Sequence, residues 1–206
     1  MQNSDTTFST PMLTDLILAH ASRLPEGTPL SAKGLLHLGA RAAIDQALSR
    51  LARRGQLIRA GRGLYFRPVA GRFGVRAPSV EQAIEALATQ RGETIVPSGA
   101  SAANGLGLTT QVPVRPVYLT SGRTRTLHLG AHVVHLRHAP RWQLVMPHRP
   151  AGQAVRALAW LGPEHVEASL MVLQRQMPSA AFAELVAAAP QFPTWLARSV
   201  AIMAHG

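Results

Sequence analysis

The sequence predicts an α+β protein: an N-terminal winged helix-turn-helix followed by a mixed α/β domain with a helical C-terminal part. Three helical segments and a glycine-containing pair of β-like runs come first, and a stretch rich in Pro, Gly and Arg separates them from the rest. Helical periodicity dominates again after residue 150. We therefore expect the winged helix-turn-helix over residues 1–70, a linker over residues 71–78 and an α+β domain over residues 79–206.

Three helices and a hairpin are expected in the first domain. Ser31 is the candidate N-cap of a short second helix over residues 33–36, and a third helix runs over residues 39–54 until Gly55 ends it. Residues 56–67 form two β-like runs around a turn with two glycines, which predicts a wing. The first helix is marked by apolar residues at helical spacing: Leu13, Leu16, Ile17, Ala21 and Leu24.

The third helix has an apolar face and an opposite, more polar face. The apolar residues recur at i, i+3, i+4 and i+7, so we expect them to be buried together: Ile44, Ala47, Leu48 and Leu51. The helix turns by about 100° per residue. Its opposite face therefore carries Ala42, Gln46, Ser49, Arg50 and Arg53.

The chemistry of this opposite face suits double-stranded DNA. Gln pairs with the N6/N7 edge of adenine, Arg pairs with O6/N7 of guanine, and Ser contacts base or backbone. The small residues Ala42 and Ser49 would let the helix approach the groove closely. A solvated face on a structural helix is the alternative, but the preceding short helix and the Arg-rich wing favour DNA. The candidate DNA contacts are Lys33, Arg41, Ala42, Gln46, Ser49, Arg50, Arg53, Arg54, Arg59, Arg62 and Arg67.

The positive charge of the chain is concentrated toward its N-terminus. The net charge is +11, of which residues 1–77 carry +7 and residues 78–150 carry +4, while the last 56 residues are neutral. Because Arg outnumbers Lys 20 to 1 and Ala, Gly and Pro are abundant, GC-rich coding is an alternative source of the charge. That bias does not explain why the basic excess disappears toward the C-terminus.

Several kinds of site and location are not expected. Cys is absent, which excludes disulfides, thiolate chemistry and Cys-based zinc sites. The sequence has no apolar run of about 18 residues, and the polar residues 1–10 contain no cationic start of a signal peptide. We therefore expect no membrane partner, no cofactor and a cytoplasmic location.

The second domain is expected to mix helices and strands. Ser79 caps a helix that ends near Gln90. Strands are predicted over residues 94–97 and 117–120, a helix packed against a sheet over 98–108, and a hairpin over 124–129 and 132–137 with a type II′ turn at Gly130 and Ala131. Apolar residues at helical spacing mark the C-terminal part: Val155, Leu158, Ala159, Leu161, Val166, Leu170, Leu173, Phe182, Leu185, Val186, Trp195, Leu196, Val200 and Ile202.

Three segments of the second domain resemble a known family. They are Pro-Ser-Gly-Ala at residues 97–100, Asn-Gly-Leu-Gly-Leu-Thr-Thr-Gln-Val-Pro at 104–113 and Tyr-Leu-Thr-Ser-Gly at 118–122. Together with the winged helix, over about residues 13–203, they make the chain similar to a divergent branch of the AbiEi-type antitoxins of bacterial abortive-infection toxin–antitoxin systems. The resemblance implies a transcriptional autorepressor that binds its own promoter. It also implies that residues 79–206 form an antitoxin domain opposing a nucleotidyltransferase-like toxin, directly or indirectly.

The segment 104–113 has a simpler physical interpretation as well. Gly105 and Gly107 flank Leu106 and allow a left-handed turn after a helix, with a polar connection before Pro113. We interpret this loop as architecture, and a ligand or partner site is the alternative.

Four histidines crowd into the predicted hairpin: His128, His132, His135 and His138. A two-residue turn at Gly130 and Ala131 places His128 and His135 on one face and His132 on the other. Zinc sites take three or four protein ligands, and this pattern places two His together. We therefore expect ordinary hydrogen bonds or exposure to water, and no metal.

No catalytic site is expected, because the phosphate-binding loop and the Gly-x-Ser-x-Gly motif are absent and the C-terminal domain lacks paired Asp residues. Glu93, Glu164 and Glu167 are the carboxylates to consider near histidines, with His165 between the last two. Two other classes of function stay open beside the DNA-binding antitoxin. One is a winged-helix regulator whose C-terminal domain binds an effector, and the other is a nucleic-acid-processing enzyme.

Overall fold

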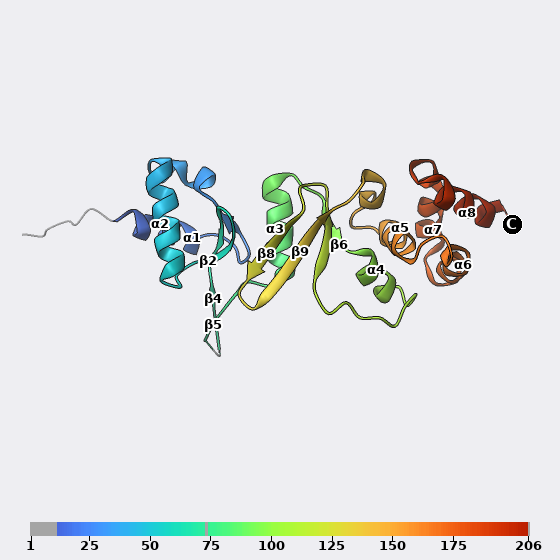
Figure 1. The fold of residues 1–206 in the computed structure, drawn as a ribbon, viewed down its shortest axis with the longest axis horizontal. Helices are drawn as coiled ribbons and strands as arrows, with labels where there is room; N and C mark the ends of the chain where they lie inside the picture. The colour runs from blue at the N-terminus through green and yellow to red at the C-terminus, as the bar shows by residue number, and fades with distance from the viewer. Residues whose placement is uncertain (1–11, 73, 206) are drawn as a thin grey trace, which may run out of the picture. The chain divides into compact units, whose positions relative to one another are not determined.

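The computed structural model describes residues 12–72 and 74–205 of the chain (Figure 1). The polar residues 1–10, which the sequence analysis considered as a possible signal peptide, lie outside the described residues. The chain divides into two compact units: residues up to Leu87 with His128–His132, and Ala88–Leu127 with residues from Val133 onward. None of the helices in the described part of the chain is long and apolar enough to cross a membrane.

The first unit contains the predicted winged helix-turn-helix. The strands of the winged helix-turn-helix form one antiparallel sheet in the order β1-β3-β2. The strands β2 and β3 are the wing, and α2 is the third helix of the prediction. The elements in chain order are α1 (Leu13–Ser22), β1 (Pro29–Leu30), the 3-10 helix η1 (Ala32–Leu38), α2 (Arg41–Arg53), β2 (Ile58–Gly61) and β3 (Leu64–Phe66).

Two local features of this unit differ from the prediction. The second helix is the longer 3-10 helix η1, and Ser31 occupies its N-cap position without a side-chain hydrogen bond. The two-residue strand β1 was not predicted, because its only strand signal is its pairing with β3. A strand this short has no period of its own to read from the sequence.

The core of the first unit joins α1, η1, α2 and the sheet. The four residues predicted to be buried on the third helix are fully buried, with 0% exposure each. They pack with apolar residues of α1 and of the strands, and Tyr65 of β3 joins the same core. The buried face of α2 is therefore confirmed, and it determines which residues of this helix face outward.

A two-stranded ribbon occupies the end of the expected first domain and part of the segment predicted as a linker. β4 (Val69–Gly71) pairs with β5 (Gly74–Arg76) in an antiparallel register. Arg76 then forms a bidentate ion pair with Glu26, at 2.8 and 3.2 Å. The sequence did not predict these strands, because each is three residues long, contains a Gly and has neither alternation nor a β-branched run.

The helix α3 (Val80–Arg91) begins where the sequence predicted it. The hydroxyl of Ser79 accepts a hydrogen bond from the backbone N–H of Gln82 at 3.2 Å and donates to the Gln82 side chain at 3.1 Å. Ser79 therefore caps the helix as expected, with Gln at the third helical position as in a capping box.

A four-stranded sheet with the order β6-β7-β9-β8 belongs mostly to the second unit. β6 and β7 are antiparallel, whereas β7 and β9 are parallel. Gly130 has φ 60° and the following Ala131 does not have a positive φ, which fits the predicted type II′ turn between β8 and β9. The strands are β6 (Ile95–Pro97), β7 (Val117–Thr120), β8 (Arg125–Leu129) and β9 (His132–His138).

A partly buried ion pair lies at one end of this sheet. Arg125 Nη2 of β8 donates to Glu93 Oε2 at 2.6 Å, and both side chains are less than one-fifth exposed. The hydroxyl of Thr120 donates to the same carboxylate oxygen at 3.1 Å. Glu93 is therefore committed to hydrogen bonds within the fold, whereas Glu164 and Glu167 are exposed.

Helices make up the rest of the second unit. The short helix of small residues, α4, packs against α5 through Ala102, Ala103 and Ala157, so its close partner is a helix and not the predicted sheet. The helices are α4 (Gly99–Gly105), the 3-10 helices η2 (Arg141–Leu144) and η3 (Ala189–Gln191), α5 (Pro150–Leu161), α6 (Val166–Gln176), α7 (Ser179–Ala187) and α8 (Thr194–His205).

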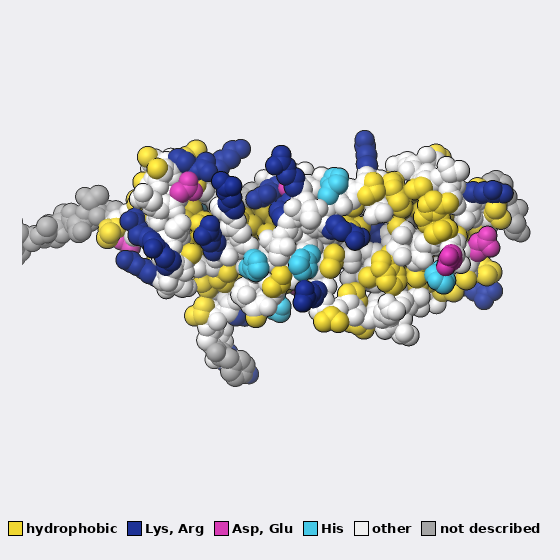
Figure 2. Space-filling model, in the orientation of Figure 1, with side chains coloured by type: hydrophobic (Ala, Val, Ile, Leu, Met, Phe, Trp, Pro, Cys, Tyr) yellow, Lys and Arg dark blue, Asp and Glu magenta, His cyan; other side chains and the backbone are white. Residues whose placement is uncertain are grey.

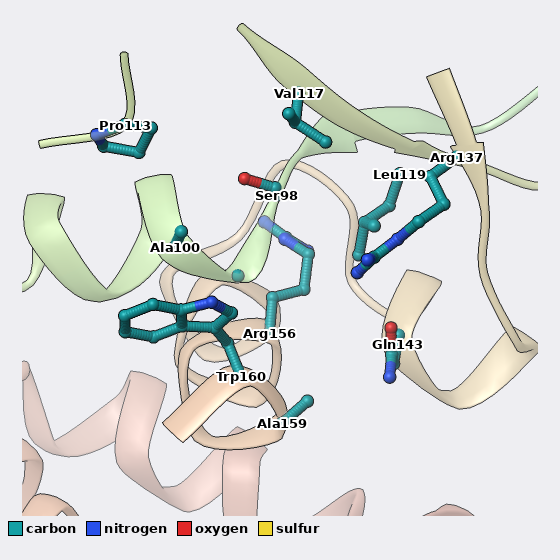
Figure 3. Close-up of a pocket in the computed structure, with 11 residues that line it drawn as sticks. Ser98, Ala100, Pro113, Val117, Leu119, Arg137, Gln143, Arg156, Ala159 and Trp160 are labelled. Carbon is teal, nitrogen blue, oxygen red and sulfur yellow. The ribbon is translucent and has the colours of Figure 1, made fainter. Parts of the chain in front are cut away.

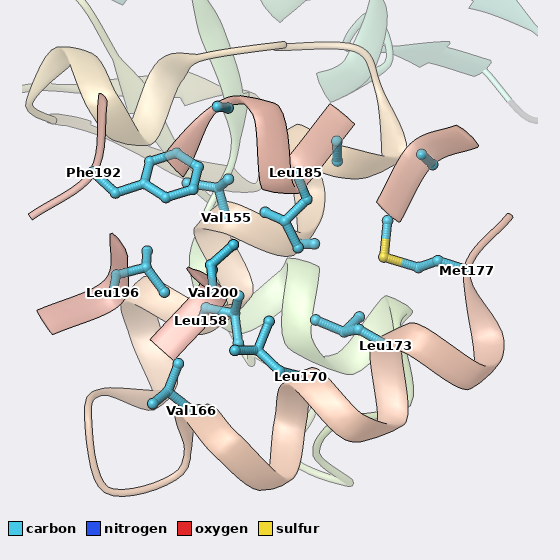
Figure 4. Packing of buried hydrophobic residues seen from close by; sticks show 14 residues of the cluster. Val155, Leu158, Val166, Leu170, Leu173, Met177, Leu185, Phe192, Leu196 and Val200 are labelled. Atoms are coloured by element: carbon cyan, nitrogen blue, oxygen red, sulfur yellow. The ribbon is translucent and has the colours of Figure 1, made fainter. Parts of the chain in front are cut away.

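The C-terminal helices share one apolar core, which contains Leu158, Leu170, Leu185 and Leu196 at 0% exposure (Figure 4). The predicted helical periodicity after residue 150 is therefore confirmed for most positions. Ile202 is an exception, because its side chain is 60% exposed.

Candidate nucleic-acid interface

The outer face of α2 is presented to solvent because the inner face is anchored in the core. The inner residues are completely buried against α1, η1 and the sheet. Ala42, Gln46, Arg50 and Arg53 lie on the opposite side of the helix and are exposed. The structure thus brings together four of the five residues that the sequence placed on one polar face.

Ser49, the fifth residue of that face, is half-buried and has a partner. Its hydroxyl lies 3.3 Å from the hydroxyl of Tyr65, within hydrogen-bond distance. Tyr65 is 3% exposed and belongs to the wing strand β3. Ser49 therefore links α2 to the wing, a role that its position in the sequence did not reveal.

Arg41, another candidate contact, is paired with Asp45. Its Nε donates to the Asp45 carboxylate at 2.9 Å, one helical turn away. Asp45 is the one acidic residue of α2. The pair neutralises that carboxylate, so the remaining cations of the outer face are not opposed by a free negative charge on their own helix.

The wing carries two further candidate contacts. Arg59 lies in β2 opposite Tyr65, and the register shifts between Arg59 and Gly61. Arg62 lies in the turn that follows, between Gly61 and Gly63. Both arginines are exposed, so the turn carries its charge at the surface.

The other candidate contacts lie at the edges of this surface. Lys33 is exposed on η1, Arg54 is exposed at the C-cap of α2, and Arg67 is half-buried between β3 and β4. Figure 2 shows Lys and Arg side chains over the region that α1, α2 and β2 occupy in Figure 1. We call α2, η1 and the wing together the basic surface of the first unit.

The ion pair of Glu26 and Arg76 lies next to the start of α3. Arg76 hydrogen-bonds the Glu26 carboxylate and thereby lowers its pKa below the usual value of 4.5. Burial opposes that shift, and the backbone N–H of Ser79 supports it by donating to the carboxylate at 3.3 Å. Arg76, which lies in the segment predicted as a linker, is thus occupied within the fold.

The histidine-rich hairpin makes ordinary hydrogen bonds. His135 Nδ1 lies 3.2 Å from the Thr126 hydroxyl, and His138 Nδ1 lies 2.8 Å from the Gly122 carbonyl oxygen. Within residues 12–72 and 74–205, no three side chains of His, Cys, Asp or Glu gather to form a metal site.

The segment 104–113 contains the predicted left-handed turn. Gly107 has φ 68°, its N–H donates to the Asn104 carbonyl at 3.0 Å, and the N–H of Leu108 donates to the Ala103 carbonyl at 2.9 Å. These two bonds end α4 in a Schellman motif. Val112 and Val114, which follow, are 73% and 97% exposed.

Comparison with known proteins identifies one family. No curated protein matches the chain significantly. The model of DUF6088, a family of unknown function, matches residues 17–176, which include most of both units. The chain therefore belongs to the DUF6088 family, a family of unknown function.

Proposed function

We propose that this protein binds double-stranded DNA through α2 and the wing, and represses transcription from its own promoter in the cytoplasm. The observation that carries the proposal is the outer face of α2. Gln46, Arg50 and Arg53 are exposed together on a helix whose opposite side is fully buried. A helix with exposed amide and guanidinium groups can read base edges in a major groove.

The charge distribution supports the same partner. Residues 1–77 carry +7 of the net +11. Phosphate contacts by Lys and Arg release counterions and supply most of the affinity that does not depend on sequence. We assign base contacts to Gln46 and Arg53, and phosphate contacts to the wing residues Arg59 and Arg62.

Binding measurements on two duplexes test the proposal. The preferred duplex is first selected from random DNA with the full chain, and a scrambled duplex serves as its reference. Gln46→Ala and Arg53→Ala should each reduce the free energy of binding to the preferred duplex by about 1–3 kcal/mol. Each variant should therefore discriminate less between the preferred and the scrambled duplex. Arg59→Ala and Arg62→Ala should weaken binding to both duplexes and reduce the salt slope by about one unit each.

Arg175→Ala is the matched control, because Arg175 is exposed on α6 of the second unit. It should bind like the wild type. Equal losses on both duplexes for Gln46→Ala would remove its base-reading role, and the absence of any enriched duplex would contradict sequence-specific binding altogether.

An antitoxin role for the second unit is a second candidate function. The observation that favours it is the exposure of Val112 and Val114. Val112 lies near the end of the segment 104–113, which carries the resemblance to AbiEi-type antitoxins, and Val114 follows that segment. Exposed apolar side chains that lie close together in one loop can form part of a contact with another protein. We propose that this loop acts against a nucleotidyltransferase-like toxin encoded beside the gene.

Co-expression with the neighbouring gene product tests the antitoxin role. The full chain should restore growth, and Val112→Asp with Val114→Asp should weaken the protection if the toxin is contacted directly. Gln46→Ala with Arg53→Ala should leave protection in place while abolishing specific DNA binding. A neighbouring product that is not toxic, or toxicity that the full chain does not relieve, would leave the plain transcriptional regulator.

A further inference from the structure

The helix α5 contains one charged residue, Arg156, and buries it. The side chains around it in the sequence are Ala, Val, Leu and Trp. Arg156 is only 4% exposed, which makes it nearly as buried as the apolar residues Val155 and Leu158 of the same helix, at 0% exposure. An arginine is rarely this buried unless it is paired.

The guanidinium of Arg156 has almost no partner in the described structure. Nη2 donates to the Pro147 carbonyl oxygen at a long 3.4 Å, and both Nε and Nη1 are buried without a hydrogen bond. Burial lowers the pKa of Arg156 to about 10 by desolvation, so the group stays protonated at neutral pH. A buried cation without a counterion is strongly unfavourable.

A pocket of about 310 Å³ lies directly beside this guanidinium (Figure 3). Arg137 reaches it from β9 and Gln143 from η2. Figure 3 shows the Arg137 side chain directed toward Arg156, whose own side chain points toward Ser98. The apolar part of the pocket lining includes Val117, Leu119 and Trp160. None of the described residues that line the pocket carries a carboxylate, so the protein itself supplies no counterion there.

The pocket is built by the close approach of α4 to α5. A Cβ at Gly99 would lie 2.5 Å from the Trp160 Cβ and would also meet the Arg156 carbonyl oxygen. Glycine at this position therefore lets the two helices meet and brings the start of α4 to the pocket wall. Ser98 is already engaged as the N-cap of α4, through the backbone N–H of Ser101 at 3.5 Å.

We propose that this pocket binds a small organic anion, whose phosphate or carboxylate group pairs with Arg156 and Arg137 while its apolar body lies against Val117, Leu119 and Trp160. Guanidinium groups match the geometry of both oxyanions and form charge-assisted hydrogen bonds with them. The volume falls at the lower end of the range for small-molecule sites. The anion would be the counterion that the residues lining the pocket do not supply to Arg156 and Arg137. The site does not depend on DNA binding.

Calorimetric titration of the full chain tests the site. Phenyl phosphate and benzoate present the two anionic groups on the same ring, and benzyl alcohol is the neutral control. At least one of the two anions should bind and benzyl alcohol should not, and the tighter anion identifies the class of natural ligand. Arg137→Gln should weaken the binding about tenfold or more, equivalent to about 1.4 kcal/mol.

Two further variants complete the test. Arg156→Met should abolish anion binding and leave the melting temperature of the free protein unchanged or higher, because it removes an unpaired buried charge with little change in volume. Arg175→Gln, outside the pocket, should bind like the wild type. If neither anion bound the wild type, or if the wild type and Arg137→Gln bound the anion with equal affinity, the proposal would be overturned. The Arg137 comparison decides this even if Arg156→Met fails to fold.

Discussion

The hydroxyl oxygen of Ser49 on α2 lies 3.3 Å from the hydroxyl oxygen of Tyr65 on β3. The two residues are 16 positions apart in the chain, and the contact is partly buried. It connects the helix that we propose reads DNA to the strand that carries the wing. The orientation of α2 relative to the wing therefore depends on this hydroxyl pair as well as on apolar packing.

Tyr65→Phe should destabilise the first unit slightly and weaken DNA binding. The change keeps the aromatic ring in the core but leaves the Ser49 hydroxyl without its partner, at a cost of about 0.5–1.5 kcal/mol. Chemical denaturation followed by far-UV circular dichroism measures the loss. Tyr118→Phe in β7 of the second unit is the control for DNA affinity, which it should leave unchanged. Unchanged stability and DNA affinity in Tyr65→Phe would mean that the contact carries no energy.

Leu48→Ala should destabilise the first unit by about 2–5 kcal/mol, because it removes a fully buried side chain and leaves a cavity. All three Trp residues lie in the second unit, at positions 142, 160 and 195, so their fluorescence reports on that unit. Calorimetry should show that the first unit melts at a lower temperature than in the wild type. The Trp-detected transition of the second unit is the internal control and should stay where it is in the wild type. A variant that keeps its melting behaviour but loses DNA affinity would show that Leu48 faces outward.

Glu26→Gln should reduce the dependence of stability on pH below about pH 5. The folded-state pKa of Glu26 is lowered by its hydrogen bond with Arg76, so its ionised form is favoured in the folded protein. That contribution is present above the usual pKa of 4.5 and is lost as pH falls through the lowered value. Melting temperatures between pH 3 and pH 6 measure the slope.

Glu164→Gln is the control for that pH series, because Glu164 is exposed and lies outside the helices. Its slope should match that of the wild type. If Glu26→Gln and the wild type gave parallel curves from pH 3 to pH 6, the ion pair with Arg76 would not contribute to acid sensitivity.

Gly99→Ala should destabilise the second unit by about 1–3 kcal/mol, because the added methyl group meets the backbone of α5 and overpacks the helix contact. Gly105→Ala is the matched variant at the other end of α4. Its Cβ would lie 3.0 Å from the Gln153 amide nitrogen, which is the end of a flexible side chain and can move. Trp-detected unfolding compares the two variants. Equal effects would show that α4 and α5 adjust freely.

The sequence by itself determined the parts of the protein that repeat with a local period. The buried stripe of α2 follows from apolar spacing alone, because each turn of a helix brings the same face around. The hairpin around Gly130 follows from a two-residue turn, and the cap at Ser79 from a pattern within one helical turn. The outer face of α2 is the complement of its buried face, so most of the candidate DNA surface could be predicted as well.

The tertiary structure decided what depends on residues far apart in the chain. The strand β1 exists through its pairing with β3, and the ribbon of β4 and β5 has no alternating pattern to predict it. Ser49 became a link to the wing only because Tyr65 is placed beside it. Arg156 was visible as one charge in an apolar helix, but its burial and its unpaired nitrogens depend on the packing of α4, α5 and their loops. Burial and hydrogen bonding of a single side chain are properties of its neighbours in space, and a local sequence period contains no information about them.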